Sequence, residues 1–126
     1  MVGTAASAAL RQTEFSARGV EVLVDPSGAD TLSLDFLLEE LGRREISHLL
    51  IEGGGWTHFE WFRSGLVNKL VFFIAPKILG GVDSIPVVGG AGFSSLEESF
   101  PLRFSPVEPI GPDLMVEAYP ADTIRS

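Results

Sequence analysis

Three consecutive glycines stand where a short apolar run gives way to a helical segment. The stretch is Leu49-Leu50-Ile51-Glu52-Gly53-Gly54-Gly55-Trp56-Thr57. The first amides of a helix have no partner within it, and the helix dipole adds about half a positive charge there. Such a turn can bind a pyrophosphate, because glycines let the anion approach the backbone and Thr57 can add a hydroxyl. The alternative is a plain tight turn whose glycines need positive φ. The pattern matches neither the Walker A loop nor G-x-G-x-x-G.

Glu52 comes directly before these glycines. A carboxylate at the C-terminal end of a buried strand lies where open α/β sheets bind their ligands. Two other interpretations of Glu52 stay open. It can be a solvated residue at a strand end, or a carboxylate that caps the helix after it.

Other residues that could take part in binding or catalysis give weaker signals. His48 and His58 have no set of carboxylates or cysteines around them that would predict a metal site, so none is expected. Gly89-Gly90-Ala91-Gly92 imitates a nucleotide loop, but no helical periodicity follows it, and we interpret it as a flexible surface loop. The pair Glu97-Glu98 is interpreted as solvated surface.

Composition limits the partners. The 126 residues are 45% hydrophobic and 21% charged, which is typical of one globular domain. Nine basic residues against 17 acidic ones give a net charge of −8, which disfavours nucleic acid as a partner. No apolar run is long enough to cross a membrane, no secretory signal is recognisable, and cysteine is absent. A cytoplasmic protein is therefore expected.

Three helices are predicted to position these residues. The first spans roughly residues 5–18 and ends before Gly19. In the second, Ser33 is the N-cap and the leucines follow the i, i+3, i+4, i+7 pattern at positions 34, 37, 38 and 41. The third runs from near Trp56 to Gly65. Its inward face is expected to be Trp56, Phe59 and Phe62, with Arg63 turned to solvent and Trp61 in the core or an interface.

Strands are predicted between the helices and after them. They are Val20 to Val24, His48 to Ile51, Lys69 to Ile74, Leu102 to Val107 and Leu114 to Tyr119. The run from Lys69 to Ile74 is apolar enough for a strand covered on both faces. The last two strands flank a turn at residues 109–113, which predicts an antiparallel hairpin. The alternation of strands and helices predicts an α/β fold, with a mostly parallel sheet, helices on both faces and a C-terminal hairpin.

Several ordered blocks give this chain a resemblance to a known family. It resembles the C-terminal reductase domain of the bifunctional riboflavin-biosynthesis deaminase/reductase, which has the dihydrofolate-reductase-like fold. The blocks are Ala17-Arg18-Gly19-Val20-Glu21-Val22; Leu38, Leu41 and Gly42; Leu50-Ile51-Glu52-Gly53-Gly54; Gly65-Leu66-Val67; Phe73-Ile74-Ala75-Pro76-Lys77-Ile78-Leu79-Gly80-Gly81; and Gly111-Pro112-Asp113-Leu114. The glycine turn is also similar to the NADPH pyrophosphate turn of dihydrofolate reductase, in which the bond between two glycines is cis. The resemblance therefore implies a cis bond here too.

The resemblance implies a reaction and a set of residues. It implies that NADPH reduces 5-amino-6-(5-phosphoribosylamino)uracil to the ribitylamino product, by hydride transfer. It places Glu52 against the substrate. The residues that it places on the cofactor side are Gly53, Gly54, Gly55, Trp56, Thr57, His58, Phe59 and Glu60.

The chain also departs from the family. Asn68 and Lys69 stand where the family often has an acidic pair, so any role of that pair is in doubt. The family's domain is about twice as long, so residues 1–126 are expected to be a single, partial reductase domain that holds the cofactor-binding half. Little or no reductase activity is expected from this chain by itself. A homodimer formed through sheet strands or their apolar faces is expected. The alternatives are a reductase of a pterin or other heterocycle, and a non-catalytic nucleotide-binding or dimerisation module.

Overall fold

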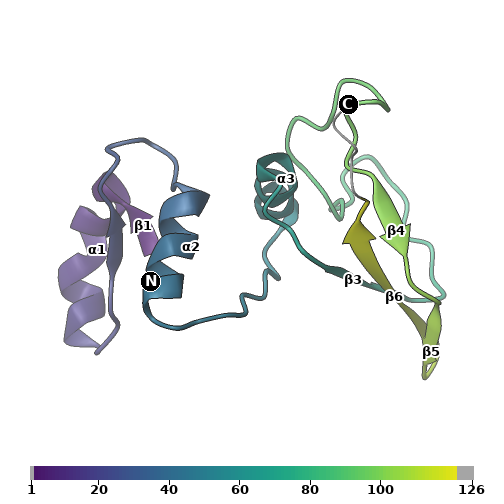
Figure 1. Cartoon of the computed structure of the whole chain (residues 1–126), viewed down its shortest axis with the longest axis horizontal. Helices are drawn as coiled ribbons and strands as arrows, with labels where there is room; N and C mark the ends of the chain where they lie inside the picture. Colours follow the sequence, from purple (N-terminus) through teal and green to yellow (C-terminus); the bar gives the residue numbers. More distant parts are fainter. Residues whose placement is uncertain (1, 122–126) are drawn as a thin grey trace. The chain divides into compact units, whose positions relative to one another are not determined.

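The computed structural model describes residues 2–121, without the side chains of residues 2 and 5–10. The chain divides into two compact units, Met1–Leu50 and Ile51–Ser126 (Figure 1). Each unit has its own helices and its own sheet, so each is described separately.

The first unit is built on two short parallel strands. In chain order it contains β1 (Val2–Thr4), α1 (Ala5–Ala17), β2 (Leu23–Asp25) and α2 (Leu34–Arg43). The strands pair with Thr4 opposite Asp25, and α1, which connects them, contacts both. The predicted end of the first helix is confirmed: α1 stops at Ala17, and Gly19 follows with φ of 72°. The strand predicted from Val20 to Val24 forms as β2, but it begins at Leu23 and ends at Asp25.

The second helix of this unit begins at its predicted cap. The Ser33 hydroxyl accepts a hydrogen bond from the Phe36 amide at 3.2 Å, which satisfies one of the free donors of the first turn. The leucine stripe of α2 is half-buried, and none of its side chains is fully buried.

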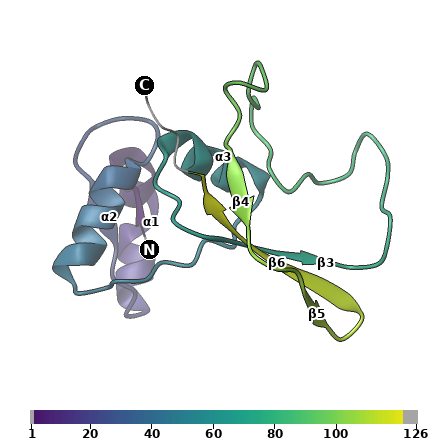
Figure 2. The same ribbon diagram turned by 45° about the vertical axis from the view of Figure 1, so that its right-hand side comes forward.

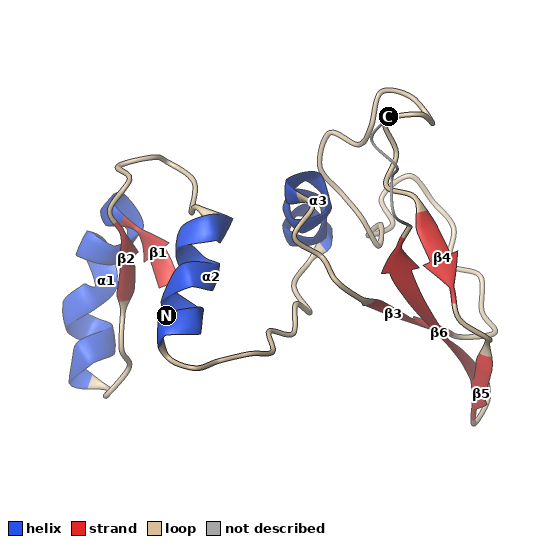
Figure 3. Ribbon diagram, viewed as in Figure 1, coloured by secondary structure: helices blue, strands red, loops and turns tan. Residues whose placement is uncertain are grey.

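The second unit is an antiparallel sheet with one helix. It contains α3 (Gly55–Ser64), β3 (Leu70–Ile74), β4 (Leu102–Phe104), β5 (Glu108–Ile110) and β6 (Asp113–Pro120) (Figure 3). The long strand β6 pairs antiparallel with the other three, in the order β3-β6-β4, and β5 also pairs with it (Figure 2). An antiparallel C-terminal hairpin forms as expected, but its first strand is β5. The strand expected from Leu102 to Val107 ends at Phe104, and β5 begins where the turn was expected. The turn of the hairpin has Gly111 at φ of 58°, as a tight two-residue hairpin requires.

The core of the second unit gathers around α3 and β6. Its buried apolar side chains are Phe59, Trp61, Leu70, Val116 and Ala118. At 100° per residue, Phe59 and Trp61 project about 200° apart, on nearly opposite sides of α3. The helix therefore has to be covered on two sides. The segment between β3 and β4 covers one of them, because Phe93 packs edge-on against Phe59 at 5.8 Å between ring centroids.

The structure corrects one expectation about this helix and confirms others. Trp56 was expected to face inward with Phe59, but 69% of it is exposed, so that expectation is wrong. The buried residues of α3 are Phe59 and Trp61. Trp56 lies closer to the start of the helix, in its first turn. Trp61 was expected in the core or an interface, and it lies in the core. Arg63 faces solvent, as expected. The helix ends at Gly65 with φ of 71°, as predicted.

The strands differ from expectation in direction and in coverage. Within residues 2–121 the parallel pairing is β1 with β2, and the other pairings are antiparallel, so the sheets are not mostly parallel. The expected strand from His48 to Ile51 does not form, and 78% of Leu50 is exposed. A strand needs a partner for its backbone groups, and in the described part of the chain no segment pairs with this one. The strand β3 is not covered on both faces, because Val71, Phe73 and Ile74 are exposed.

Candidate functional site

The glycine turn leads directly into α3, as the sequence predicts. Gly54 is the N-cap residue, with φ of −45° and ψ of 171°, and it offers no side chain to the helix. The first bond of the helix runs from the His58 amide to the Gly54 carbonyl at 3.2 Å. The amides of Gly55, Trp56 and Thr57 therefore have no acceptor within the helix and remain available to an anion.

The alternative of a plain tight turn fails on the backbone angles. None of Gly53, Gly54 and Gly55 has positive φ, so none is required for its access to the left-handed region. The expected cis bond is also wrong, because no peptide bond within the described residues is cis.

The three glycines have different surroundings. A Cβ on Gly55 would stand 2.7 Å from the Gly89 nitrogen and 3.0 Å from the Pro86 carbonyl oxygen, so only glycine fits there. A Cβ on Gly53 would make ordinary contact with the Thr57 side chain at 3.4 Å. A Cβ on Gly54 would meet no described atom within 4 Å outside its chain neighbours. Packing thus explains Gly55, while Gly54 leaves open space next to the free amides.

The second glycine segment lies against this helix. The Gly89 amide donates to the Gly55 carbonyl at 2.9 Å, and Gly90 packs on the Phe59 ring. This differs from the interpretation of Gly89-Gly90-Ala91-Gly92 as a flexible surface loop. Ala91 and Gly92 are exposed as that interpretation implies, but Gly89 and Gly90 are fixed to α3. The missed signal is the pair of adjacent glycines, which lets one backbone approach another closely.

Glu52 is exposed and lies immediately before the turn. Its carboxylate caps no amide of α3 in the described structure, so the capping interpretation is not what the geometry shows. Its exposure fits both the solvated interpretation and a carboxylate that meets a ligand over the turn.

The remaining residues on the predicted cofactor side are distributed unevenly. Trp56 and Thr57 are exposed in the first turn, whereas the Phe59 side chain is buried. The ring nitrogen Nδ1 of His58 lies 2.8 Å from the Val87 carbonyl. Glu60 accepts a hydrogen bond from Arg63 at 2.6 Å, so the nearby arginine is already paired. A phosphate at this turn would rely on backbone amides rather than on side-chain cations.

Sequence reasoning missed a polar anchor in the first unit. The Asp25 carboxylate is 2% exposed and accepts hydrogen bonds from the amides of Ser33 at 2.7 Å and Ser27 at 2.9 Å. These bonds, first that from Ser33, hold the pKa of Asp25 below its usual range. They close residues 25–33 into a defined loop that places Ser33 at the start of α2. Its signal is Asp25-Pro26-Ser27-Gly28, in which an aspartate begins a turn and binds the backbone two residues on.

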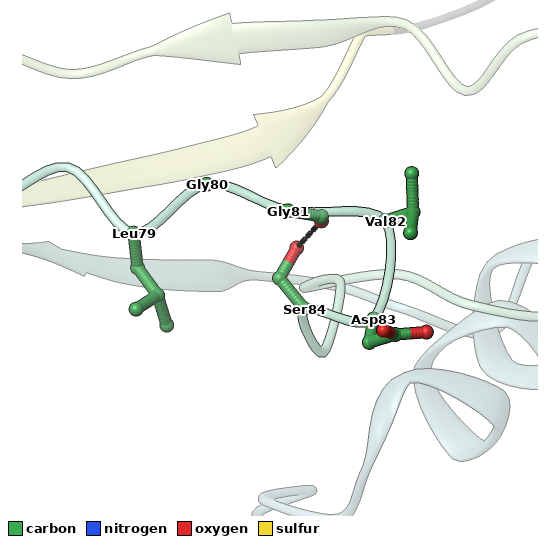
Figure 4. Close-up of a pocket in the computed structure, with 6 residues that line it drawn as sticks. All are labelled: Leu79, Gly80, Gly81, Val82, Asp83 and Ser84. Carbon is green, nitrogen blue, oxygen red and sulfur yellow. Dashed lines mark hydrogen bonds between the residues drawn. The ribbon is translucent and has the colours of Figure 1, made fainter.

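Other candidates carry no site. His48 contacts the Ser47 hydroxyl at 2.9 Å and is exposed. Among the described residues no three His, Asp or Glu side chains gather as metal ligands. Residues 79–84 form an open hollow that a single loop lines (Figure 4). Its Ser84 hydroxyl donates to the Gly81 carbonyl of the same loop at 2.8 Å, so it is not directed at a ligand. No helix in residues 2–121 has the length and apolar character of a membrane span.

Lys69 stands where the family often has an acidic residue. It pairs with Glu117 on the neighbouring strand β6, and this pairing raises the pKa of Lys69 and lowers that of Glu117. At this position the chain therefore uses a cross-strand ion pair.

Comparisons with known proteins agree on one family. The model of the RibD C-terminal domain matches residues 1–116. A riboflavin biosynthesis protein RibD from Actinobacillus pleuropneumoniae is 35% identical over 104 residues, which are 82% of this chain and 28% of that protein. A 2,5-diamino-6-ribosylamino-4(3H)-pyrimidinone 5′-phosphate reductase from Methanothermobacter thermautotrophicus is 31% identical over 117 residues, which are 93% of this chain and 53% of that protein.

Solved structures show the same fold. A pyrimidine reductase-like protein from Corynebacterium diphtheriae aligns with a TM-score of 0.74 at 24% identity, over 94% of this chain and 48% of that one. RibD from Acinetobacter baumannii aligns with a TM-score of 0.72 at 22% identity, over 86% and 29%. The expected dihydrofolate-reductase-like α/β class is thus confirmed, although strand directions differ in detail. The chain spans between about a quarter and a half of the length of these proteins.

Proposed function

Because the chain belongs to the family of RibD C-terminal domains, we propose that it holds the cofactor-binding part of an NADPH-dependent pyrimidine reductase of riboflavin biosynthesis. The reaction is the reduction of 5-amino-6-(5-phosphoribosylamino)uracil to its ribitylamino product. In this reaction the bond between the anomeric carbon of the ribose and its ring oxygen breaks. The carbon takes a hydride, which bound NADPH would supply on becoming NADP⁺, and the ring oxygen takes a proton. The family match and the names of the relatives support a reductase of riboflavin biosynthesis.

The single observation that carries the proposal is the turn from Gly53 to Thr57. It combines three free amides at a helix start with open space at Gly54. This fits a pyrophosphate, because the anion can accept from several amides at once and experiences the positive end of the helix dipole. NADPH supplies the hydride when it is bound, and the chain holds its phosphates and limits how it can lie.

Glu52 is proposed to face the substrate. It is exposed, it directly precedes the phosphate turn, and it caps no helix amide. A carboxylate in that place can accept hydrogen bonds from the hydroxyl or amino groups of a ribosylaminopyrimidine.

The test of the cofactor site is Gly54→Asp, measured by NADPH fluorescence titration. Aspartate is a favoured N-cap and fits the open space, so α3 should be as stable as before or more so. Its carboxylate would occupy the free amides and repel phosphate, and NADPH affinity should fall at least roughly tenfold. The control is Gly80→Asp, which adds the same charge at another open position and should leave affinity unchanged.

Turnover separates the substrate role of Glu52 from the cofactor role of the turn. In a complete enzyme that carries Glu52→Gln, reduction of the pyrimidine should slow while NADPH affinity stays within about threefold. Unchanged turnover would remove Glu52 from the substrate site. The unaltered chain by itself should bind NADPH with little or no turnover, because it is proposed to hold only the cofactor-binding part. Absence of NADPH binding would refute the proposed function.

We also propose that the chain forms a homodimer through the β3 side of its sheet. The strand β3 pairs with β6 on one edge, and Val71, Phe73 and Ile74 are exposed. An apolar sheet edge of this kind pairs readily with another chain. Sedimentation at micromolar concentration should show a dimer that Phe73→Glu converts to monomer. Phe104→Glu, at an equally exposed phenylalanine on β4, should leave the dimer intact.

A further inference from the structure

The segment from Pro86 to Phe93 contacts the first two turns of α3 at three points. Its backbone meets Gly55, its Val87 carbonyl meets the His58 ring, and Gly90 with Phe93 meets the Phe59 ring. These contacts fall in the same first turns of α3 as the amides of Gly55, Trp56 and Thr57 that have no acceptor within the helix.

The backbone contact is close in both directions. A Cβ on Gly89 would stand 3.2 Å from the Gly55 carbonyl carbon and 3.3 Å from the Trp56 nitrogen. The Gly89 amide also donates to the Gly55 carbonyl at 2.9 Å. The position of the Gly55–Trp56 peptide is therefore set by a segment more than thirty residues away in the sequence.

The His58 contact fixes the orientation of a side chain in the same helix. The Val87 carbonyl can only accept, so Nδ1 of His58 carries the hydrogen and donates it over 2.8 Å. This bond joins the fourth residue of α3 to the segment.

The Phe59 contact depends on a missing side chain. Gly90 has φ of 76°, and a Cβ there would stand 2.3 Å from Phe59 Cδ1. Gly92 has nearly the same backbone, with φ of 71°, but a Cβ there would meet nothing within 4 Å. Both glycines therefore have a positive φ, but only Gly90 is packed against another side chain.

We propose that residues 87–90 are a positioning element for the phosphate turn, and that they act through Gly55, His58 and Phe59. They hold the first turn of α3 so that its free amides converge on one anion. The inference rests on the proposed function, because the anion is the cofactor's pyrophosphate. None of residues 87–90 needs to touch the cofactor for this role.

The experiment compares Gly90→Ala with Gly92→Ala. Both alanines strain the backbone alike, but only the first displaces Phe59 and the helix behind it. NADPH titration at a temperature where circular dichroism shows both variants folded should give a Kd at least roughly tenfold higher for Gly90→Ala, and within about threefold for Gly92→Ala. In a complete enzyme that carries Gly90→Ala, the cofactor KM should rise with kcat little changed, which loss of stability alone would not produce. Equal affinities in the two variants would overturn the proposal.

Substitutions at His58 give a rescue test. His58→Asn keeps an amide donor near the position of Nδ1 and should retain most of the affinity, whereas His58→Ala should lose it. His58→Gln, whose donor lies nearer the position of Nε2, should resemble the alanine variant. If all three variants bind NADPH equally, the Val87 contact positions nothing.

Amide chemical shifts separate this inference from the proposed function. In the protein without cofactor, the amides of Gly55, Trp56 and Thr57 should shift in Gly90→Ala and stay unchanged in Gly92→Ala. If the unaltered chain fails to bind NADPH, the proposed function is wrong, and the shifts still decide whether the segment positions the turn. Unchanged shifts in both variants would refute the positioning role even if NADPH binds.

Discussion

The two units of the chain differ in the chemistry of their interiors. In the second unit the buried side chains are apolar, and two of them, Phe59 and Trp61, lie on opposite sides of one helix. In the first unit the buried side chain among those described is a carboxylate, Asp25, while the leucines of α2 are only half-buried. Among the described side chains, the interior of the second unit is therefore apolar, and that of the first contains a polar anchor that fixes a loop.

This difference matters for where a ligand can be held. An anion site needs backbone amides in fixed positions, and the glycine turn obtains them from a helix with cover on two sides. The first unit fixes one loop equally well, but there the amides of Ser27 and Ser33 are already bound to Asp25. In the first unit, Asp25 accepts from the loop amides. In the second unit, the amides of Gly55, Trp56 and Thr57 have no acceptor within the helix.

The largest effect is expected from removing the core of the second unit. Trp61→Ala deletes a buried aromatic side chain, which costs about 3–5 kcal/mol in protein cores. Chemical denaturation should report a loss of that size in the free energy of unfolding. Trp61→Phe should give an intermediate loss, so the series remains informative if the alanine variant does not fold.

Trp56→Ala is the matched control on the same helix. Its side chain is largely exposed, so the free energy of unfolding should change by no more than about 0.5 kcal/mol. A large loss in Trp56→Ala would mean that the Trp56 side chain is buried beside Phe59, which is the arrangement expected from sequence alone.

These two tryptophans also show what the sequence can and cannot predict. Features with a local code were predicted correctly, such as the Ser33 cap and the helix ends before Gly19 and Gly65. Each depends on a few neighbouring residues. The choice between Trp56 and Trp61 depends on what covers α3, and that includes a segment some thirty residues later. Periodicity assumes one buried face, and this helix has two.

The same reasoning applies to the strands and to the candidate site. The hairpin at Gly111 was predictable because its turn chemistry is local. The strand expected at 48–51 did not form, because a strand depends on partners that its own sequence does not specify. The glycine turn was found from its residue types, but the reason for Gly55 was not. That reason is the close approach of Gly89, which only the tertiary structure reveals.

A second, smaller effect is expected from the polar anchor of the first unit. Asp25→Asn keeps one acceptor oxygen and loses the charge, so at pH 7 the melting temperature should fall by several degrees. The pKa of Asp25 is lowered in the folded protein, so its carboxylate stabilises the fold above about pH 4, and this contribution is lost as pH falls through the folded pKa.

The difference between Asp25→Asn and the unaltered protein should therefore shrink when the pH is lowered below about 4. Thermal melts at several pH values measure it. Asp30→Asn, at an exposed position of the same loop, is the control and should leave the melting temperature unchanged. A difference that stays constant with pH would show that shape, rather than charge, makes Asp25 the anchor.

The smallest effect is expected from the surface ion pairs, which both units contain. Arg44 of the first unit binds Glu21 at 2.7 Å and Glu40 at 2.8 Å, while Lys69 of the second pairs with Glu117. Exposed pairs contribute little and are screened by salt, so Arg44→Gln and Lys69→Gln should lower the melting temperature only slightly, and less in 1 M salt, where the Debye length is about 3 Å. Arg44→Gln should have the larger effect because two carboxylates lose a partner.

The carboxylates themselves report this effect more sharply than melting does. Hydrogen bonding to Arg44 is the main cause of the lowered pKa of Glu21, whereas Glu40 also accepts from Arg43 at 2.8 Å. In Arg44→Gln the pKa of Glu21 should return towards its usual range, and that of Glu40 should stay partly lowered. Titration followed by NMR measures both. Equal recovery of the two would mean that Arg43 does not hold Glu40 in solution, and that the cluster depends on a single arginine.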